Sequence, residues 1–204
     1  MALNTYAALK TSLAGWMNVS AADLSSQIDD VVTVGETRIY REAKTRDGEQ
    51  SYATAMAGGV LSVPSDYVEM KVIYCSANPG VPLERRSLEW LYANYPRVSA
   101  SSGIPQFFSR DGSNFVFGPV PDGSYTATAV YYRKFPALST ATNNQFLNNP
   151  DLYLFACLAE SEILIGRDAR IPLWEAKYNK ILADANGLAR REDSSGSTPR
   201  MRMM

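Results

Sequence analysis

The sequence predicts an α+β fold: a helical bundle built from the N- and C-terminal helices, an inserted small antiparallel β domain, and an extended C-terminal tail. Apolar residues recur every three to four positions near both ends, as on one face of a helix. In the middle the spacing falls to two, which is typical of half-buried strands. At 204 residues, 46% of them hydrophobic, the chain can bury a core without a metal or a disulfide. The predicted segments are N-terminal helices over 1–57, a β-rich platform with one short helix over 58–136, C-terminal helices over 137–193 and the tail over 194–204.

Two helices are predicted in the N-terminal segment. The first runs from an N-cap at Thr5 to about residue 17, with its apolar side chains on one stripe. The second begins near Ser26, with Asp29 and Asp30 in a first turn where acids favour the helix dipole. Within it, Gly35 costs roughly 1 kcal/mol relative to alanine. We therefore expect another backbone to cross closely at this glycine.

The C-terminal end of this second helix is basic, which suits the negative end of the helix dipole. The cations are Arg38, Arg41, Lys44 and Arg46. Two interpretations stay open for them. A solvated end of a surface helix is the commoner case, and a strip that binds phosphate is the alternative.

The middle segment is predicted to hold strands and one short helix. Two strands between Val60 and Cys75 flank a Pro64–Ser65 turn, and a helix spans Ser87–Asn94 before Pro96 ends it. Three more strands are expected at Phe107–Phe108, Phe115–Phe117 and Tyr125–Arg133, the first two of them joined by a hairpin at Gly112. The proline-rich turn over residues 118–123 lacks the Lys-Ser/Thr pair of a nucleotide loop.

The C-terminal segment is predicted to be helical again. Residues 148–151, Asn-Asn-Pro-Asp, are a helix start signal, and a broad apolar face continues to Gly166. A last helix is expected over about residues 171–190, with Pro172 in its first turn.

Composition excludes several classes of chemistry. The chain has no histidine, which excludes Ser-His-Asp and Cys-His catalysis, His-ligated metals and imidazole pH switching. Cys75 and Cys157 are too few for a Cys₄ site and sit among apolar neighbours, where a thiol packs as a small hydrophobe. We expect no metal and no cofactor. With no signal peptide and no membrane span evident, we expect the protein to be made and kept in the cytoplasm.

Carboxylates remain the only candidates for acid-base work, and none has a distinguishing context. Three pairs stand out: Asp29 with Asp30, Asp66 with Glu69, and Glu160 with Glu162. A glycosidase would need two carboxyls roughly 5–10 Å apart in a cleft. We therefore expect no catalytic residues and no enzyme activity.

Aromatic residues gather in the strand-rich segment. They are Tyr92, Tyr95, Phe107, Phe108, Phe115, Phe117, Tyr125, Tyr131 and Tyr132. They could form a platform that stacks sugars or bases, or they could fill the core of a small sheet. A net charge of −1 gives no sign of a nucleic-acid groove and favours the core.

The tail alternates cations and thioethers. Arg200 and Arg202 alternate with Met201, Met203 and Met204, so an extended chain would show charge on one side and adaptable apolar groups on the other. Such a segment can become ordered on a partner by adding a strand or filling a cleft.

Several motifs, in this order along nearly the whole chain, resemble the head-to-tail adaptors of tailed bacteriophages, also called head-completion or connector proteins. Their order is more specific than any single one. They are residues 6–16, residues 28–41 with Glu36-Thr37-Arg38-Ile39, residues 63–69, Gly103-Ile104-Pro105, residues 117–125, Tyr131-Tyr132, residues 136–138, residues 150–154 and residues 174–178.

The resemblance implies a structural, oligomeric virion protein acting in tail assembly. Such adaptors form a ring, typically a dodecamer of twelve copies, between the portal and the tail proteins (nozzle or stopper), and line the DNA channel. Their C-terminal tails reach into the portal, which assigns portal docking here to Pro199, Arg200, Met201, Arg202 and Met203. Contact with double-stranded DNA would be transient and non-specific, since strong phosphate contacts would hold the DNA. The protein would be synthesised in the bacterial host cytoplasm, would reside at the head-tail interface of the virion and would have no membrane partner.

Two other classes are weighed against the adaptor. The alternative is a carbohydrate-binding module that uses the aromatic strand residues, and a third is a hydrolase that uses a carboxylate pair.

Overall fold

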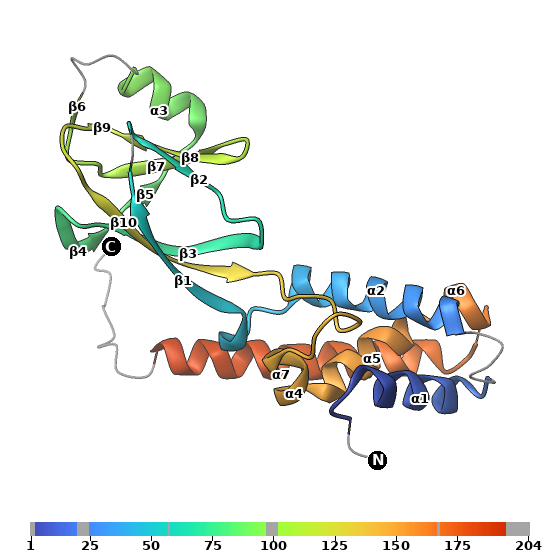
Figure 1. The fold of residues 1–204 in the computed structure, drawn as a ribbon. Helices are drawn as coiled ribbons and strands as arrows, with labels where there is room; N and C mark the ends of the chain where they lie inside the picture. The colour runs from blue at the N-terminus through green and yellow to red at the C-terminus, as the bar shows by residue number, and fades with distance from the viewer. Residues whose placement is uncertain (1–2, 20–24, 57, 97–101, 167, 195–204) are drawn as a thin grey trace. The chain divides into compact units, whose positions relative to one another are not determined.

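The computed structural model describes residues 3–19, 25–56, 58–96, 102–166 and 168–194, and confirms the predicted α+β fold. The chain divides into two compact units (Figure 1). The helical unit comes from both ends, up to Gly48 and from Phe135 onward, and the β unit is Glu49–Lys134. We predicted that the β-rich segment begins at residue 58. It begins earlier because residues 49–55 form a strand that pairs within the β unit.

The helical unit contains two elements that the sequence pattern did not predict, a 3₁₀ turn and a one-turn helix. Its elements are α1 (Tyr6–Met17), α2 (Ser25–Glu42), η1 (Arg46–Gly48), α4 (Asn144–Asn148), α5 (Pro150–Ala159), α6 (Glu162–Ile165) and α7 (Ile171–Ser194). η1 and α4 are the two unpredicted ones. In α4, the Asn143 side chain accepts a hydrogen bond from the Phe146 N–H at 2.8 Å and so caps the helix.

The start of α1 is confirmed as predicted. The Thr5 hydroxyl oxygen accepts from the Ala8 N–H at 3.2 Å, and Asn18 ends the helix in the left-handed region at φ 58. The prediction that Asp29 lies in the first turn of α2 was wrong, because α2 begins at Ser25. Asp29 instead accepts a hydrogen bond from the Tyr6 hydroxyl and pairs with Lys10 at 2.6 Å, which ties α2 to α1.

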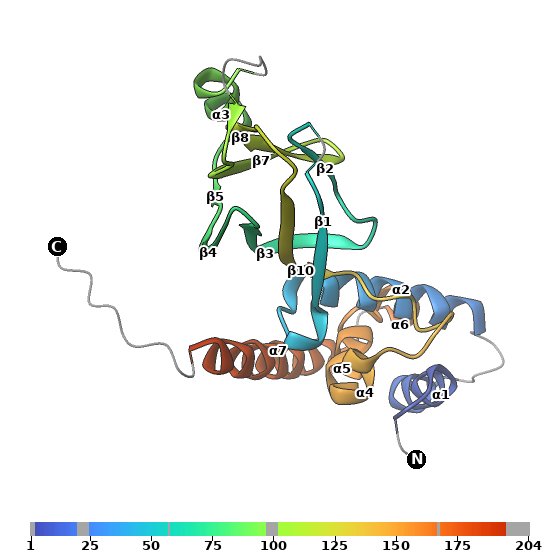
Figure 2. The same cartoon turned by 60° about the vertical axis from the view of Figure 1, so that its left-hand side comes forward.

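Helix α5 forms the centre of the helical unit. Every residue from Leu152 to Ala159 is buried, and its neighbours include α1, α2 and α7 (Figure 2). The predicted single helix up to Gly166 is interrupted after Ala159, where the Ser161 hydroxyl donates to the Leu158 carbonyl at 2.6 Å and α6 starts anew. Helix α7 extends four residues beyond the predicted end at 190.

The β unit contains two four-stranded sheets and a two-stranded pair. Sheet order is β1-β10-β3-β4 in the first sheet, β2-β8-β7-β5 in the second, and β6-β9 in the pair. Antiparallel pairing dominates as predicted, but β5-β7 and β6-β9 are parallel. The strands are β1 (Glu49–Ala55), β2 (Val60–Ser62), β3 (Tyr67–Cys75), β4 (Asn78–Pro82), β5 (Glu84–Arg85), β6 (Ser102–Gly103), β7 (Phe107–Asp111), β8 (Asn114–Gly118), β9 (Val120–Pro121) and β10 (Thr126–Arg133).

The two larger sheets share one apolar core. Phe108, Phe115 and Phe117 from the second sheet pack with Ala127 and Ala129, both 0% exposed, on β10 of the first. Large rings against small methyl groups fill the space between the sheets without overpacking it. Helix α3 (Leu88–Asn94) contacts β7 and begins at Ser87, which accepts from the Trp90 N–H as an N-cap.

Candidate functional site

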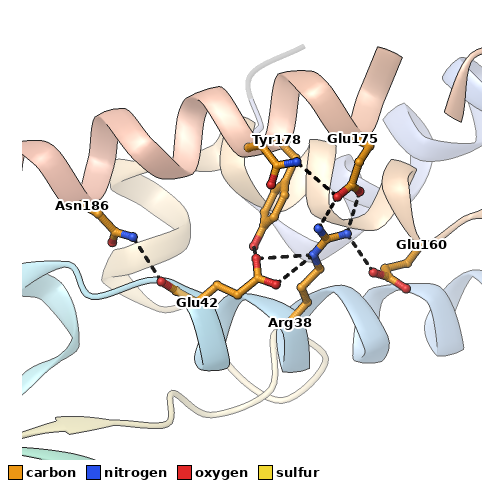
Figure 3. Close-up of polar contacts among 7 residues, drawn as sticks. Arg38, Glu42, Glu160, Glu175, Tyr178 and Asn186 are labelled. Carbon is orange, nitrogen blue, oxygen red and sulfur yellow. Dashed lines mark hydrogen bonds and ion pairs between the residues drawn. The ribbon is translucent and has the colours of Figure 1, made fainter. Parts of the chain in front are cut away.

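A charged network in the helical unit centres on Arg38 in α2 (Figure 3). Its guanidinium makes a two-pronged contact with Glu175 of α7, in which Nη1 donates to Oε2 at 2.8 Å and Nη2 to Oε1 at 2.5 Å. Nη1 also donates to Glu160, just after α5, at 3.0 Å, and Nε lies 3.4 Å from Glu42. One side chain therefore joins α2 to two other parts of the bundle.

Tyr178 completes this network from α7. The Arg38 guanidinium carbon lies 4.4 Å from the centroid of the Tyr178 ring, and the tyrosine hydroxyl donates to Glu42 at 2.8 Å. A planar guanidinium stacks on a ring while its edge binds carboxylates, which a lysine cannot do. Farther along α7, Asn186 donates to the Glu42 carbonyl at 3.1 Å and accepts from the Lys44 N–H at 2.8 Å, so α7 also caps the end of α2.

The network keeps its charges. Hydrogen bonds from Arg38 hold the pKa of Glu175 below its usual range. Hydrogen bonding and attraction to Glu175 raise the pKa of Arg38, against the opposing effect of burial. Burial, with the hydrogen bond to Glu42, raises the pKa of Tyr178. At neutral pH the arginine and Glu175 are therefore ionised and the tyrosine is neutral, an arrangement that stabilises the packing of α2 against α7.

Two residues before Arg38 on the same helix, Glu36 anchors the chain where it returns from the β unit. This side chain is 4% exposed, and its carboxylate accepts from the Leu138 N–H at 2.9 Å. A buried carboxylate that accepts a backbone N–H fixes the position of that backbone. Glu36 and Arg38 both belong to the Glu36-Thr37-Arg38-Ile39 motif, so this turn of α2 organises the helical unit. The sequence pattern marked the motif but gave no sign of these partners.

The predicted basic strip is not a set of free cations. Arg38 is bound by three carboxylates, and Arg46 pairs with Glu192 at 3.3 Å. Neutralised arginines bind phosphate poorly. Both sequence interpretations treated these arginines as exposed charge, so both were wrong for Arg38.

In each of the three carboxylate pairs named from the sequence, one member is engaged with a partner outside the pair. Asp29 pairs with Lys10, Glu160 pairs with Arg38, and Asp66 accepts from the Tyr131 hydroxyl at 2.9 Å. Within the described ranges, no three acidic or thiol side chains gather in a way that could hold a metal ion. Both cysteines are buried free thiols, as expected, and burial raises the pKa of Cys157. Among the helices that the structure describes, none has the length and apolar content of a membrane span.

The aromatic residues divide between core and surface. Four of the nine, Phe108, Phe115, Phe117 and Tyr131, are at most 5% exposed and cannot stack a ligand. The half-buried Tyr95 and Phe107 pack with Trp90, which sequence reasoning missed, and with Arg86, whose guanidinium lies 5.1 Å from the Trp90 ring. Four of the nine residues proposed for a sugar platform are thus buried, and the other five are half-buried.

We name a surface of the helical unit the Trp16 patch. It comprises Trp16, the buried Phe155 ring that Trp16 contacts, Lys177 beside that ring, and Leu173, one turn before Lys177 on the same face of α7. The Trp16 ring is 48% exposed and meets the Phe155 ring edge-on at 5.9 Å, while Leu173 is 70% exposed. The Lys177 ammonium lies 5.4 Å from the Phe155 ring, and Arg170 donates to the Trp16 carbonyl at 2.9 Å. An exposed tryptophan with an apolar neighbour and a basic rim is typical of a protein contact site.

A second surface lies on α2, in a groove of about 470 Å³ that we name the α2 groove. Thr33, Val34 and Thr37 line it, with Arg41 and Glu160 among the charged residues of its wall. Both threonine hydroxyls donate to carbonyls four residues earlier in the helix, at 2.9 and 2.8 Å, so they are already satisfied. Val34 is 37% exposed. This groove and the Trp16 patch are built from different residues.

The portal-docking residues predicted from the resemblance, Pro199, Arg200, Met201, Arg202 and Met203, lie outside the described residues. The structure therefore gives the anchor point of this segment, the end of α7 at Ser194, and no contact of the segment itself.

A comparison with family sequence models matches one family, described as the SU10 adaptor protein. Its sequence model matches residues 4–202, which covers both units and most of the tail. The chain belongs to the SU10 adaptor protein family. This is a family of phage head-to-tail adaptors, so the chain is a structural protein of the virion. No curated protein matches the sequence.

In this SU10 adaptor protein, the Arg38 network and Glu36 connect α2 to other parts of the helical unit, and the apolar side chains of Trp16 and Leu173 are exposed. The order of the motifs in the sequence led to the family, while the network and the exposed side chains became visible only in the fold.

Proposed function

We propose that the chain forms a ring, of twelve copies in the virion, between the portal and the tail proteins. The ring extends the DNA channel, and its C-terminal segment docks on the portal through Pro199, Arg200, Met201, Arg202 and Met203. The observation that carries the proposal is the family match over residues 4–202. The match extends beyond the end of α7 at Ser194 to residue 202, so it includes most of the segment to which the proposal gives portal docking.

Two features of the helical unit support a ring. A ring that closes by rotation needs one surface of each copy to meet a different surface of the next. The Trp16 patch and the α2 groove are two such surfaces, one with a projecting aromatic side chain and one hollowed. The Arg38 network, which fixes α2 and α7 to each other, would keep the two surfaces at a constant angle.

Charge supports a channel through which DNA slides. The net charge is −1, and Arg38, Arg46 and Arg170 each pair with an acid of the same unit. Few released counterions mean weak, salt-dependent contact with phosphate. Contact with double-stranded DNA in the channel is therefore transient and non-specific in this proposal.

We expect the purified protein to be monomeric alone, or to form a ring, and to bind the portal in a defined stoichiometry. Mass measurement of the reconstituted portal complex should give twelve copies per portal ring, because heterologous contacts close at a fixed number.

Trp16→Ser together with Leu173→Ser should lower the amount of assembled adaptor roughly tenfold, since hot-spot residues dominate interfaces. Ser12→Ala, on the same helix as Trp16, is the control. Assembly that is unaffected by the double variant would remove the Trp16 patch from the proposed ring contact.

We expect deletion of residues 195–204 to weaken association with the portal at least tenfold, roughly the effect of losing one or more hot-spot side chains. Co-sedimentation with purified portal measures it. Met201→Ser with Met203→Ser tests the apolar half of the segment, and Arg200→Ser with Arg202→Ser tests the charged half. Association that is unchanged after the deletion would contradict tail docking, while the ring stoichiometry would still be decided by the mass measurement.

A further inference from the structure

A third hollow in the helical unit lies at the end of α7, and we name it the α7-end pocket. Its volume is about 280 Å³. Its wall comprises Thr45, Asp47, Ala185, Leu188, Ala189 and Glu192, among others. Leu188 is 59% exposed although it borders the pocket, so an apolar side chain stands open to solvent there. The pocket uses neither the Trp16 patch nor the α2 groove.

The wall of this pocket contains a buried hydroxyl group, that of Thr45, without a hydrogen-bond partner among the described residues. The residue is 6% exposed, and among the described residues its hydroxyl oxygen has no hydrogen-bond partner. Most buried polar atoms in folded proteins have a partner, and an unpaired one costs stability. A segment bound in the pocket could supply a backbone N–H or C=O to this hydroxyl.

The pocket also lies where the C-terminal segment begins. Glu192 is part of its wall, and α7 ends two residues later at Ser194. From Ser194 back to Leu188 is roughly 9 Å along the helix axis, and five extended residues span roughly 16 Å. Residues 195–199, which include Gly196 and Pro199, are enough to turn the chain back toward the pocket. Residues 200–204 can therefore reach it within one chain.

We propose that the α7-end pocket holds residues 200–204, Arg-Met-Arg-Met-Met, of the same chain before the adaptor meets its partners. The thioethers of Met201 and Met203 would cover Leu188 and the two alanines of the wall, because methionine adapts to irregular apolar surfaces. The charged wall residues are Arg46, Asp47 and Glu192; Glu192 pairs with Arg46 at 3.3 Å, so Asp47 is the acid that would face Arg200 or Arg202. Asp47 accepts from the Asn148 amide at 2.9 Å and keeps capacity for an arginine.

Tethering favours the same chain over a second copy as the source of the segment. A short linker gives an effective concentration of roughly millimolar, well above the concentration of free protein in a typical solution. Docking of this kind would keep apolar thioethers from joining free copies to one another, and portal binding would have to release the segment. The proposal goes beyond portal docking and does not depend on it.

Disulfide trapping tests the proposal, because the two native thiols are buried. Ala185→Cys with Met203→Cys should form an intramolecular disulfide in the full-length monomer. The control pair is Ala183→Cys with Met203→Cys. Ala183 is exposed, whereas Ala185 lines the pocket two residues farther along the same helix. Under mild oxidation, we expect the disulfide of the pocket pair to form at least tenfold faster than that of the control pair. The reason is that a segment held in the pocket keeps residue 203 near residue 185 and away from residue 183.

A second measurement avoids introduced thiols. Leu188→Asp should increase protease cleavage after Arg200 and Arg202, because an acid in the apolar wall would expel the thioethers. Ala183→Asp, at an exposed position of the same helix that does not line the pocket, should leave that cleavage unchanged. Equal trapping rates for the two cysteine pairs, or cross-links only between copies, would overturn the proposal. Loss of portal binding on deletion of the tail would stand in either case, so the two proposals fail independently.

Discussion

Replacement of Arg38 by methionine is expected to lower the free energy of unfolding of the helical unit by about 2–3 kcal/mol, because three carboxylates lose their shared cation. Breaking a fully buried pair costs about 3–5 kcal/mol, and the partners here are partly screened by solvent. The side chains of Arg38, Glu160 and Glu175 are 18%, 29% and 39% exposed. Chemical denaturation followed by helical circular dichroism measures the change.

Two variants separate the network from loss of charge alone. Arg41→Met removes a cation three residues farther along the same helix, where the side chain is exposed, and should change stability by less than about 0.5 kcal/mol. Arg38→Lys keeps the charge but loses the two-pronged contact with Glu175 and stacks poorly on Tyr178, so it should recover only part of the loss. An Arg38→Met protein as stable as the Arg41→Met protein would contradict a stabilising role for the network.

The pH dependence of stability is an independent test of the contact between Arg38 and Glu175. Since the pKa of Glu175 is lowered in the folded state, its stabilising effect is present above the unfolded value of about 4.3 and is lost as the pH falls through the folded value. The stability difference between wild type and Arg38→Met should therefore be full at neutral pH and should shrink below about pH 4. A difference that is constant with pH would mean that Arg38 acts through packing alone.

The helical half of the fold could be predicted because the start signal and the apolar spacing of each main helix lie in its own local sequence. Thr5 caps α1, Pro150 starts α5 and Pro172 lies in the first turn of α7, and each precedes apolar residues at helical spacing. The break after Ala159 was missed, because the apolar period continues through it while the Ser161 hydroxyl turns inward to a backbone carbonyl. A hydrogen bond of this kind cannot be predicted from the spacing of apolar residues alone.

Strand β1 shows why the boundary of the β unit was missed. Its sequence, Glu-Gln-Ser-Tyr-Ala-Thr-Ala, has one large apolar side chain, so alternation is barely visible. The segment becomes a strand because β10 pairs with it along its whole length. Likewise β2 and β3, which flank the Pro64–Ser65 turn as predicted, belong to different sheets. Such pairing depends on strands that are distant in the sequence, so it cannot be predicted from the residues of either strand alone.

The site could be predicted even less. Arg38 lies 122 residues from Glu160 and 137 from Glu175, and no local pattern couples them. The basic end of α2 was visible in the sequence, but its neutralisation was not. Family resemblance came closer to function than chemistry did, because an adaptor works through shape and contact surfaces, which require no conspicuous cluster of reactive residues.

Gly35 offers the sharpest test of the bundle, because the predicted close crossing is confirmed. A Cβ built at Gly35 would lie 2.8 Å from the Cys157 sulfur, 3.1 Å from its amide nitrogen and 3.2 Å from its Cα. Two of these atoms are backbone of α5 and cannot rotate away. Gly35→Ala should therefore lose about 3 kcal/mol or more to overpacking and regain about 1 kcal/mol of helix propensity, a net destabilisation of about 2 kcal/mol.

The matched control is Gly15→Ala in α1, where a Cβ would meet no atom within 4 Å. Its expected effect has the opposite sign, a gain of about 0.5–1 kcal/mol, because only the helix-propensity gain remains. Denaturation midpoints of the two variants, measured in parallel, decide the comparison. Stabilisation by both alanines would show that α2 and α5 can separate at no cost, which the crossing at Cys157 contradicts.

A double-mutant cycle locates the clash at that crossing. Cys157→Ala removes the sulfur, the nearest of the three atoms, and leaves the backbone contacts in place. Gly35→Ala should then be less harmful in the Cys157→Ala protein than in the wild type, by about 1 kcal/mol, because residues in contact couple. Gly15→Ala should show no such coupling to residue 157. If the changes in the free energy of unfolding caused by Gly35→Ala and Cys157→Ala are additive, Gly35→Ala destabilises α2 through other contacts. The close crossing of α2 and α5 would then not be what holds the bundle rigid.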